Sequence, residues 1–313
     1  MCTGVSSGYS RRPARVATDV KKAPQLIRAL QDQGIDTANL SPIGVRPRLG
    51  TYLADLWERR HFIWMDARHR VATQNSRNRL GNAWLLLRPL LDAGLYFVIF
   101  GVVLHVTRDT IDNFAAYVLI GVLMFRSTMR SISQGPGTLQ SGKSMIRAFT
   151  FQRAALPISA EIRDALQMTY TIVIVLVMIV AIPPHEWPQW SWFLIVPIFA
   201  LQFILNLGIS FVMARVGFLV PDVSQLMTIV GRFLMYGSGV IFPIDRFLTH
   251  PAVAEVIRAN PIYQMLAMYR QVLMNGTVPS PDSWLILGGW AFGLLIFGFL
   301  FFWRGEASYG GGQ

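Results

Sequence analysis

The sequence has few charged residues and almost no cysteine. Charged residues make up 14% of the 313 residues, whereas hydrophobic residues make up 53%. Charged residues are roughly a quarter of an ordinary soluble domain, so the composition indicates a membrane protein. Cys2 is the only cysteine. An internal disulfide is therefore excluded, and a thiolate metal site is disfavoured.

The chain also lacks a recognisable catalytic or metal-binding pattern. No cluster of histidines and carboxylates has the spacing of a metal site, and the five histidines are scattered along the chain: His61, His69, His105, His185 and His250. The nearest approach to an acidic motif is Glu161 with Asp164, beside Arg163. We therefore predict no metal, no cofactor in this chain and no enzymatic activity.

Long apolar runs dominate what is present. About 20 apolar residues cross roughly 30 Å of hydrocarbon as a helix, and none of the runs shows the alternation of a β-barrel strand. We predict an all-α integral membrane protein with six transmembrane helices in a domain over 51–305, between a mobile basic tail (1–50) and a short C-terminal tail (306–313). The six spans are 83–106, 114–133, 166–183, 192–214, 223–244 and 284–303.

The distribution of basic residues predicts the orientation. The first 82 residues hold 14 Lys and Arg against 6 Asp and Glu, and they contain no apolar segment typical of a cleaved signal peptide. The excess of positive charge places the N-terminus in the cytoplasm, and six spans return the C-terminus to the same side. The net charge of +11 concentrates near predicted membrane surfaces, which indicates anionic lipids rather than nucleic acid as partners.

Two further segments are expected at the membrane boundary. Residues 52–71 place apolar side chains on one helical face, which predicts an amphipathic helix lying in the membrane interface; packing on a soluble partner is the alternative. These side chains are Leu53, Leu56, Trp57, Ile63, Trp64, Ala67 and Val71. Between the last two spans, two short amphipathic pieces meet at Asn260-Pro261. The portion 263–274 is too apolar for a free loop, so we predict a re-entrant segment there.

Residues 135–144, GPGTLQSGKS, match the phosphate-binding loop pattern, with Gly137, Gly142 and Lys143 at the required spacing. A genuine phosphate-binding loop follows a short buried strand in an α/β domain, whereas a transmembrane run precedes this segment. No soluble stretch is long enough to hold such a domain. We interpret the segment as a flexible basic turn entering a cytoplasmic helix, with nucleotide binding at Lys143 as the alternative.

Four arginines lie inside the predicted spans: Arg88, Arg126, Arg130 and Arg232. A charged group in a membrane is costly unless it is paired or hydrated, so each is a candidate functional residue. Arg88 has the spacing to pair with Asp92 on its own helix, while Arg126 and Arg130 repel each other unless an anion or water lies between them. Snorkelling to lipid phosphates is the alternative for Arg130. Arg232 is predicted near the bilayer centre, facing a water-filled path or a partner helix.

Aromatic residues in the first and fifth spans could provide stacking surfaces for sugar rings. Core packing or an interfacial aromatic belt is the alternative interpretation. The residues are Trp84, Tyr96, Phe97, Phe100, Phe233, Tyr236 and Phe242.

Four segments, in this order, resemble one known family. The first contains a Leu-Gly, Trp and Leu-x-Pro-Leu pattern (Leu80, Gly81, Trp84, Leu87, Pro89 and Leu90), and the others are MIRAFTFQRAALPIS, VIFPIDRF and NPIYQMLAMYRQVLMNG. Over about residues 52–305 the chain resembles the permease subunit of polysaccharide-exporting ABC transporters, which include O-antigen, teichoic-acid and capsule exporters. Two positions depart from the family: Gln152 follows Phe151 where the family has proline, and Pro221 precedes Asp222 where it has arginine.

The resemblance implies a homodimer of channel-forming permeases in the bacterial cytoplasmic membrane. Two ABC ATPase subunits with ATP and Mg would drive export of a polyprenyl-diphosphate-linked glycan. The diphosphate candidates are Arg88, Arg126, Arg130 and Arg232, and the glycan-channel candidates are Trp84, Tyr96, Phe97, Phe100, Phe233 and Tyr236. The ATPase-coupling candidates are Lys143, Arg147, Phe151, Arg153 and Pro157. The alternatives are a permease for a drug or small lipid and a membrane enzyme of lipid-linked sugar metabolism.

Overall fold

The structure is a computed structural model that describes residues 48–74, 78–99, 113–142, 152–181, 185–242 and 251–309. The chain divides into two compact units, Met1–Val45 and Arg46–Gln313, and all described residues belong to the second. The predicted tail over 1–50 therefore lies almost entirely outside the described residues. Four candidate site residues also lie outside them: Phe100, Lys143, Arg147 and Phe151.

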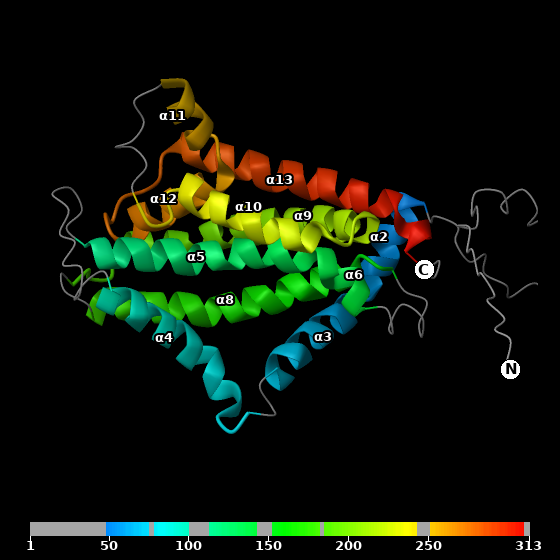
Figure 1. Cartoon of the computed structure of the whole chain (residues 1–313), viewed down its shortest axis with the longest axis horizontal. Helices are drawn as coiled ribbons and strands as arrows, with labels where there is room; N and C mark the ends of the chain where they lie inside the picture. The colour runs from blue at the N-terminus through cyan, green and yellow to red at the C-terminus, as the bar shows by residue number, and fades with distance from the viewer. Residues whose placement is uncertain are drawn as a thin grey trace, which may run out of the picture. The chain divides into compact units, whose positions relative to one another are not determined.

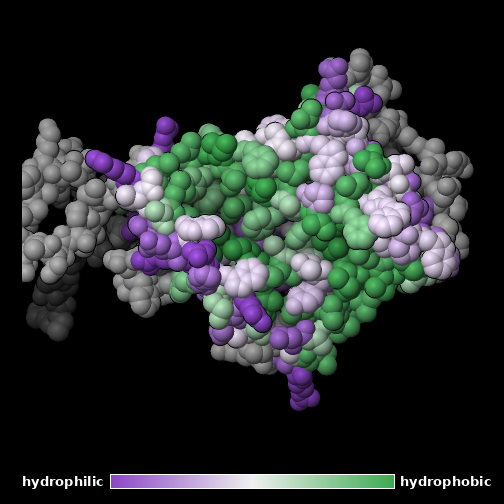
Figure 2. Space-filling view, turned by 180° about the vertical axis from the view of Figure 1, so that it is seen from behind, coloured by the Kyte–Doolittle hydropathy of each residue, from purple (hydrophilic) through white to green (hydrophobic). Residues whose placement is uncertain are grey.

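Four long helices form the centre of the described unit (Figure 1). They are α5 (Phe114–Gln134), α8 (Ala155–Ala181), α9 (Ile195–Leu219) and α13 (Pro281–Arg304). Together with short flanking turns, these are the 4 segments among the described residues that are long and apolar enough to cross a membrane. Figure 2 shows a broad hydrophobic surface on one face of this unit, with hydrophilic side chains gathered toward its ends.

Shorter helices surround this centre. They are α2 (Leu49–Glu58), α3 (Arg60–Thr73), α4 (Trp84–Phe97), α6 (Thr138–Ser141), α10 (Val223–Gly237), α11 (Pro251–Arg258) and α12 (Pro261–Leu273). The predicted first and fifth spans correspond to α4 and α10, but α10 has 15 residues and ends seven residues before the predicted end of its span. The described part of the chain thus confirms an all-α fold with four candidate spans, while the six-span count stays a prediction.

Buried polar side chains join the central helices. Gln202 on α9 donates from Nε2 to the Met124 carbonyl oxygen of α5 at 3.1 Å, and accepts from the Tyr269 hydroxyl of α12 at 2.9 Å. Asn206 donates from Nδ2 to Ser127 Oγ at 3.3 Å. Because an unpaired polar group is costly inside an apolar bundle, these bonds fix the register of α5, α9 and α12.

Helices α9 and α13 cross at two glycines. A Cβ atom placed on Gly298 would lie 2.4 Å from the Gly208 carbonyl oxygen, and one placed on Gly208 would lie 2.6 Å from the Leu294 carbonyl carbon. Backbone atoms cannot move aside as a flexible side chain can. Small residues therefore allow the close approach of these two helices, as is common in membrane bundles.

The GPGTLQSGKS segment begins where α5 ends. Gly135–Gly137 form a 3-10 turn, and the four residues between Gly137 and Gly142 form α6, with Leu139 buried. A 21-residue helix, rather than a strand, precedes this turn. The two glycines thus flank a turn of helix and follow a helix, which is not the context of a phosphate-binding loop. Lys143 and Ser144 lie outside the described residues, so the flexible basic turn stays a prediction.

The predicted interfacial helix over 52–71 is two helices, α2 and α3, which meet at Arg59. One side of the pair, including Ile63 and Ala67, is buried, and α3 contacts α8. Trp57 and Trp64 remain 69% and 46% exposed. The apolar face is therefore divided: part of it packs against the bundle, and two tryptophans point outward.

Between α10 and α13 the chain forms α11 and α12, which are separated at Asn260 as the sequence predicted. The Asn260 side chain accepts a hydrogen bond from the Ile262 amide and so caps α12. Helix α12 contacts α5, α9 and α13, and its apolar side chains are buried in the core. This burial explains the high hydropathy of 263–274, while its depth in a membrane stays a prediction.

Arg270 on α12 connects three helices in a way that the sequence did not reveal. Its guanidinium donates to the carbonyl oxygens of Gly239 at 2.9 Å and Val240 at 2.7 Å, just after α10, and lies over the Tyr117 ring of α5. Gly239 has a φ of +65°, a conformation that favours glycine at a helix end. Arg270 thus stabilises the point at which α10 stops.

Candidate functional site

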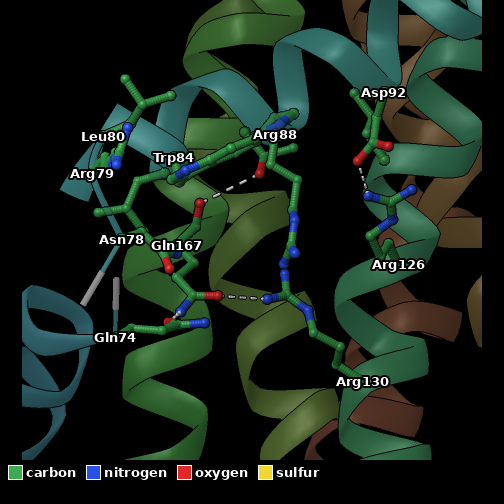
Figure 3. A pocket seen from close by; sticks show the side chains of 14 residues that line it. Gln74, Asn78, Arg79, Leu80, Trp84, Arg88, Asp92, Arg126, Arg130 and Gln167 are labelled. Atoms are coloured by element: carbon green, nitrogen blue, oxygen red, sulfur yellow. Dashed lines mark hydrogen bonds and ion pairs between the residues drawn. The ribbon is translucent and has the colours of Figure 1, made fainter. Parts of the chain in front are cut away.

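A cavity of about 1000 Å³ lies among α4, α5 and α8, with the end of α3 at its side. Figure 3 shows the side chains that line it. Its charged lining residues are Arg79, Arg88, Asp92, Arg126 and Arg130, so among the described residues it holds four arginines and one carboxylate. The cavity therefore brings together three of the four arginines predicted from the sequence.

Asp92 forms an ion pair with Arg126, from α4 to α5 (Figure 3). This corrects the suggestion that Asp92 pairs with Arg88 on its own helix. Both side chains remain partly exposed, at 28% for Asp92 and 40% for Arg126. Because the pair borders the cavity rather than the dry core, a ligand that enters can reach Arg126.

Arg130 is held by polar side chains of α8. Its Nη1 atom donates to Gln167 Oε1 at 2.7 Å and lies 3.9 Å from Asp164 Oδ1. Gln167 also donates to Gln74, which directly follows α3. Arg126 and Arg130 lie one turn apart on α5, but each has its own partner on another helix, and this reduces the repulsion expected between them.

Arg88 and Arg79 also line the cavity, and among the described residues neither has an ion-pair partner. Both side chains are exposed, and no hydrogen bond or ion pair to either occurs within the described part of the chain. Figure 3 shows the Arg88 side chain extending from α4 toward the side of the cavity where Arg130 lies. Two unpaired guanidinium groups thus border the same space, so the cavity has the charge expected of an anion site.

The candidate aromatic residues are not gathered at this cavity. Trp84 lines it, whereas Phe233 and Tyr236 lie on α10 and are 75% and 63% exposed. Arg232 is also exposed on α10, so the fourth predicted arginine is separate from the other three. Tyr96 and Phe97 are half-buried on α4, with Tyr96 packed against the core. The structure therefore presents two candidate surfaces, one at the cavity and one on α10.

Arg153, a predicted coupling residue, is bound within the chain. Its backbone amide donates to Glu306 Oε1 at 2.9 Å, and its guanidinium donates to the Glu306 carbonyl oxygen. The Tyr52 hydroxyl donates to Glu306 Oε2 at 3.0 Å and accepts from the Ala154 amide at 3.1 Å. We call Tyr52, Arg153 and Glu306 the C-terminal node. This node joins α2, the start of α8 and the turn after α13. Pro157, another predicted coupling residue, is not part of the node and is buried in α8.

Burial sets the electrostatics of this node. Burial raises the pKa of the Glu306 carboxyl above its ordinary value, while the Arg153 amide and charge and the Tyr52 hydroxyl oppose the rise. Burial and the nearby Glu306 charge raise the pKa of the Tyr52 hydroxyl, so it remains a hydrogen-bond donor at neutral pH. No local sequence pattern indicates this cluster, because Tyr52 and Glu306 are 254 positions apart.

A second, smaller cavity of about 400 Å³ lies beyond Arg130. Its lining includes the carboxylates of Asp66, Glu161 and Asp164, the last two of which are buried. The sequence marks Glu161 with Asp164 as the nearest approach to an acidic motif, but it does not predict their burial. Within the described ranges, no three histidine, cysteine or carboxylate side chains converge in a way that could hold a metal ion.

Comparison with known proteins identifies relatives of one kind, although no known family profile matches the chain. The chain is 20% identical over 208 residues to the O-antigen export system permease protein RfbA of Myxococcus xanthus, covering 66% of this chain and 78% of that protein. It is 23% identical over 200 residues to the protein of that name from Klebsiella pneumoniae, covering 64% and 74%. The polysialic acid transport protein KpsM of Escherichia coli is 24% identical over 216 residues, covering 68% and 81%. These relatives match the polysaccharide-exporter permease family, which is the family that the sequence motifs resemble.

Proposed function

We propose that this chain is the channel-forming membrane subunit of an ABC exporter for a polyprenyl-diphosphate-linked surface polysaccharide. The observation that carries the proposal is the arginine-lined cavity, found in a chain whose relatives are permeases and transport proteins for surface polysaccharides. The exporter would work in the bacterial cytoplasmic membrane, with both termini of this chain in the cytoplasm.

The cavity suits the diphosphate headgroup of such a substrate. Guanidinium groups bind phosphate oxygens with paired, charge-assisted hydrogen bonds. Arg88 and Arg79 form no ion pair with another described residue that a ligand would have to break. A volume of about 1000 Å³ is also at the upper end of the size usual for small-molecule sites, roughly 300–1,000 Å³. The headgroup would bind between α4 and α5, with Arg88 on its α4 side and Arg126 and Arg130 on its α5 side.

Energy would come from partner subunits. In the proposed complex, two ABC ATPase subunits carry the ATP and Mg and bind near the segment between α6 and α8. Their ATP binding would favour one of two permease arrangements over the other. The proposed contacts are Lys143, Arg147, Phe151, Arg153 and Pro157. Because Arg153 is bound to Glu306, Arg153 would contribute to coupling by holding the C-terminal node together rather than by contacting the ATPase directly.

A second copy of the chain would complete the channel. Helix α10 exposes large apolar side chains, including Leu226 and Phe233, together with Arg232. An exposed arginine in an apolar helix face is costly against lipid but not beside water. We therefore place the exposed face of α10 toward a water-filled path between two copies. Phe233 and Tyr236, with Trp84, Tyr96 and Phe97 of α4, would offer weak stacking surfaces to passing sugars.

Export by Arg88→Ala and Arg126→Ala variants tests this proposal. Both substitutions should reduce the polysaccharide at the cell surface while the amount of the chain in the membrane stays normal. Arg258→Ala is the matched control, because Arg258 is an exposed arginine on α11 that does not line the cavity. Unchanged export in both cavity variants, at normal membrane levels, would refute a headgroup role for this cavity.

A further inference from the structure

We propose that Asp92 makes the cavity selective for diphosphate headgroups over the phosphodiester headgroups of bulk phospholipids. Asp92 would do so by competing with the ligand for Arg126. The inference rests on the proposed function, in which the cavity receives an anionic lipid headgroup. It assigns a role to the one carboxylate among the described lining residues.

The ion pair between Asp92 and Arg126 gives the cavity a built-in competitor. The two groups come from different helices and remain partly exposed at the cavity wall. An anion that binds Arg126 at Nη1 must displace the Asp92 carboxylate. Arg79 and Arg88 present no such barrier within the described residues, because neither is ion-paired there.

The charge of a ligand determines whether it can displace Asp92 from Arg126 with a net gain in binding. A phosphodiester carries one negative charge, so at Arg126 it only exchanges one anion for another and gains little. A diphosphate carries charge on two adjacent phosphates. One phosphate can replace Asp92 at Arg126 while the other binds Arg88 or Arg130, so a net attraction remains. Specificity of this kind requires an element that disfavours the wrong ligand, and Asp92 is such an element.

The positions of the charges on the helices fit a ligand with two anionic groups. Arg88 and Asp92 are one turn apart on α4, and Arg126 and Arg130 are one turn apart on α5, which is about 5.4 Å along each axis. The Asp92–Arg126 contact brings the two pairs together at the cavity wall, with Arg88 on the side of Arg130 (Figure 3). A phosphate that displaces Asp92 would therefore lie within one turn of both remaining arginines.

Replacement of Asp92 by asparagine should weaken this selectivity. Asp92→Asn keeps the size of the side chain but removes its charge, so a phosphodiester no longer competes with a carboxylate. We expect the affinity for a phosphodiester to rise about fivefold and the affinity for a diphosphate to change less. Fivefold corresponds to about 1 kcal/mol, the upper range for a partly exposed ion pair.

The test compares two ligands that share one lipid tail. The purified full chain is placed in nanodiscs of phosphatidylcholine, and binding of farnesyl diphosphate is compared with binding of the methyl phosphodiester of farnesyl phosphate. The wild type should prefer the diphosphate, and Asp92→Asn should lower the ratio of affinities about fivefold. Asp92→Glu, which keeps the charge, should keep the preference. Asp282→Asn is the matched control, since Asp282 is an exposed acid at the start of α13.

The outcomes separate this inference from the proposed function. If the wild type does not bind farnesyl diphosphate, the headgroup site itself is refuted. If it binds but the ratio is the same in Asp92→Asn as in the wild type, only the role of Asp92 is refuted. An unpaired Arg126 could impair folding of Asp92→Asn. The double variant Asp92→Asn with Arg126→Gln removes the whole pair, and its ratio of affinities should also fall; an unchanged ratio there refutes the inference equally.

Discussion

Replacement of Glu306 by alanine should destabilise the chain strongly, because its buried carboxylate accepts two hydrogen bonds and forms an ion pair. Glu306 is 4% exposed, and its carboxylate accepts from the Tyr52 hydroxyl and the Arg153 amide. The Arg153 guanidinium is its ion-pair partner, with Nη1 3.7 Å from Glu306 Oε1. Each buried donor left unpaired costs about 1–3 kcal/mol, and breaking a buried ion pair costs about 3–5 kcal/mol. The Arg153 side chain is 21% exposed and can recruit water, so we expect a total near the lower end, about 3 kcal/mol.

A series of variants tests the origin of this loss. Glu306→Gln keeps acceptor capacity and should cost less than alanine. Tyr52→Phe removes two hydrogen bonds, to Glu306 and from the Ala154 amide, and should cost about 1–3 kcal/mol. Glu255→Ala, at an exposed acid on α11, should have almost no effect. The measurement is denaturant unfolding of each purified variant in the same detergent. If Glu306→Ala unfolds at the same denaturant concentration as Glu255→Ala, the C-terminal node does not stabilise the fold.

Three further predictions concern helix packing, pH and nucleotide binding. Gly298→Val should destabilise the α9–α13 crossing by about 1–3 kcal/mol or more, whereas Gly293→Val, which meets open space on the same helix, should be tolerated in the same unfolding assay. The raised pKa of Glu306 means that the folded state binds a proton more tightly than the unfolded state. The resulting contribution to stability is present at acid pH and is lost as pH rises through the folded pKa. Glu306→Gln should flatten that part of the plot of stability against pH, and an unchanged plot would show that another group is responsible. The purified chain alone should not bind ATP in equilibrium dialysis, and binding that disappears in Lys143→Ala would restore the phosphate-binding loop interpretation.

Much of the helical architecture could be predicted because long apolar runs dominate their own environment. The cores of α5, α8, α9 and α13 lie in predicted spans for this reason. Hydropathy does not show where a helix ends, so the fifth predicted span ran past Gly237. The glycine at position 239 was the sequence signal for this end. In the structure, Gly239 has a positive φ and accepts a hydrogen bond from Arg270 just after α10.

The site was only partly predictable because its partners are set by tertiary contacts. Arg88, Arg126 and Arg130 stand out as charges within apolar runs. The sequence alone suggests that Asp92 forms an ion pair with Arg88 on the same helix. The observed ion pair with Arg126 arises only from the packing of α4 against α5. The C-terminal node joins residues 254 positions apart, so no local pattern could have indicated it.

Transport by a reconstituted complex tests the central claim most directly. The chain and its partner ATPase are placed in lipid vesicles, and the ATP-dependent transfer of a polyprenyl-diphosphate-linked glycan is measured. We predict no transfer by the chain alone, transfer with the ATPase, and a loss of at least about tenfold in the Arg88→Ala and Arg126→Ala variants, which corresponds to about 1.4 kcal/mol of headgroup binding. Transfer or chemical conversion of the glycan lipid by the chain alone, or full transfer by both variants, would contradict the proposed function.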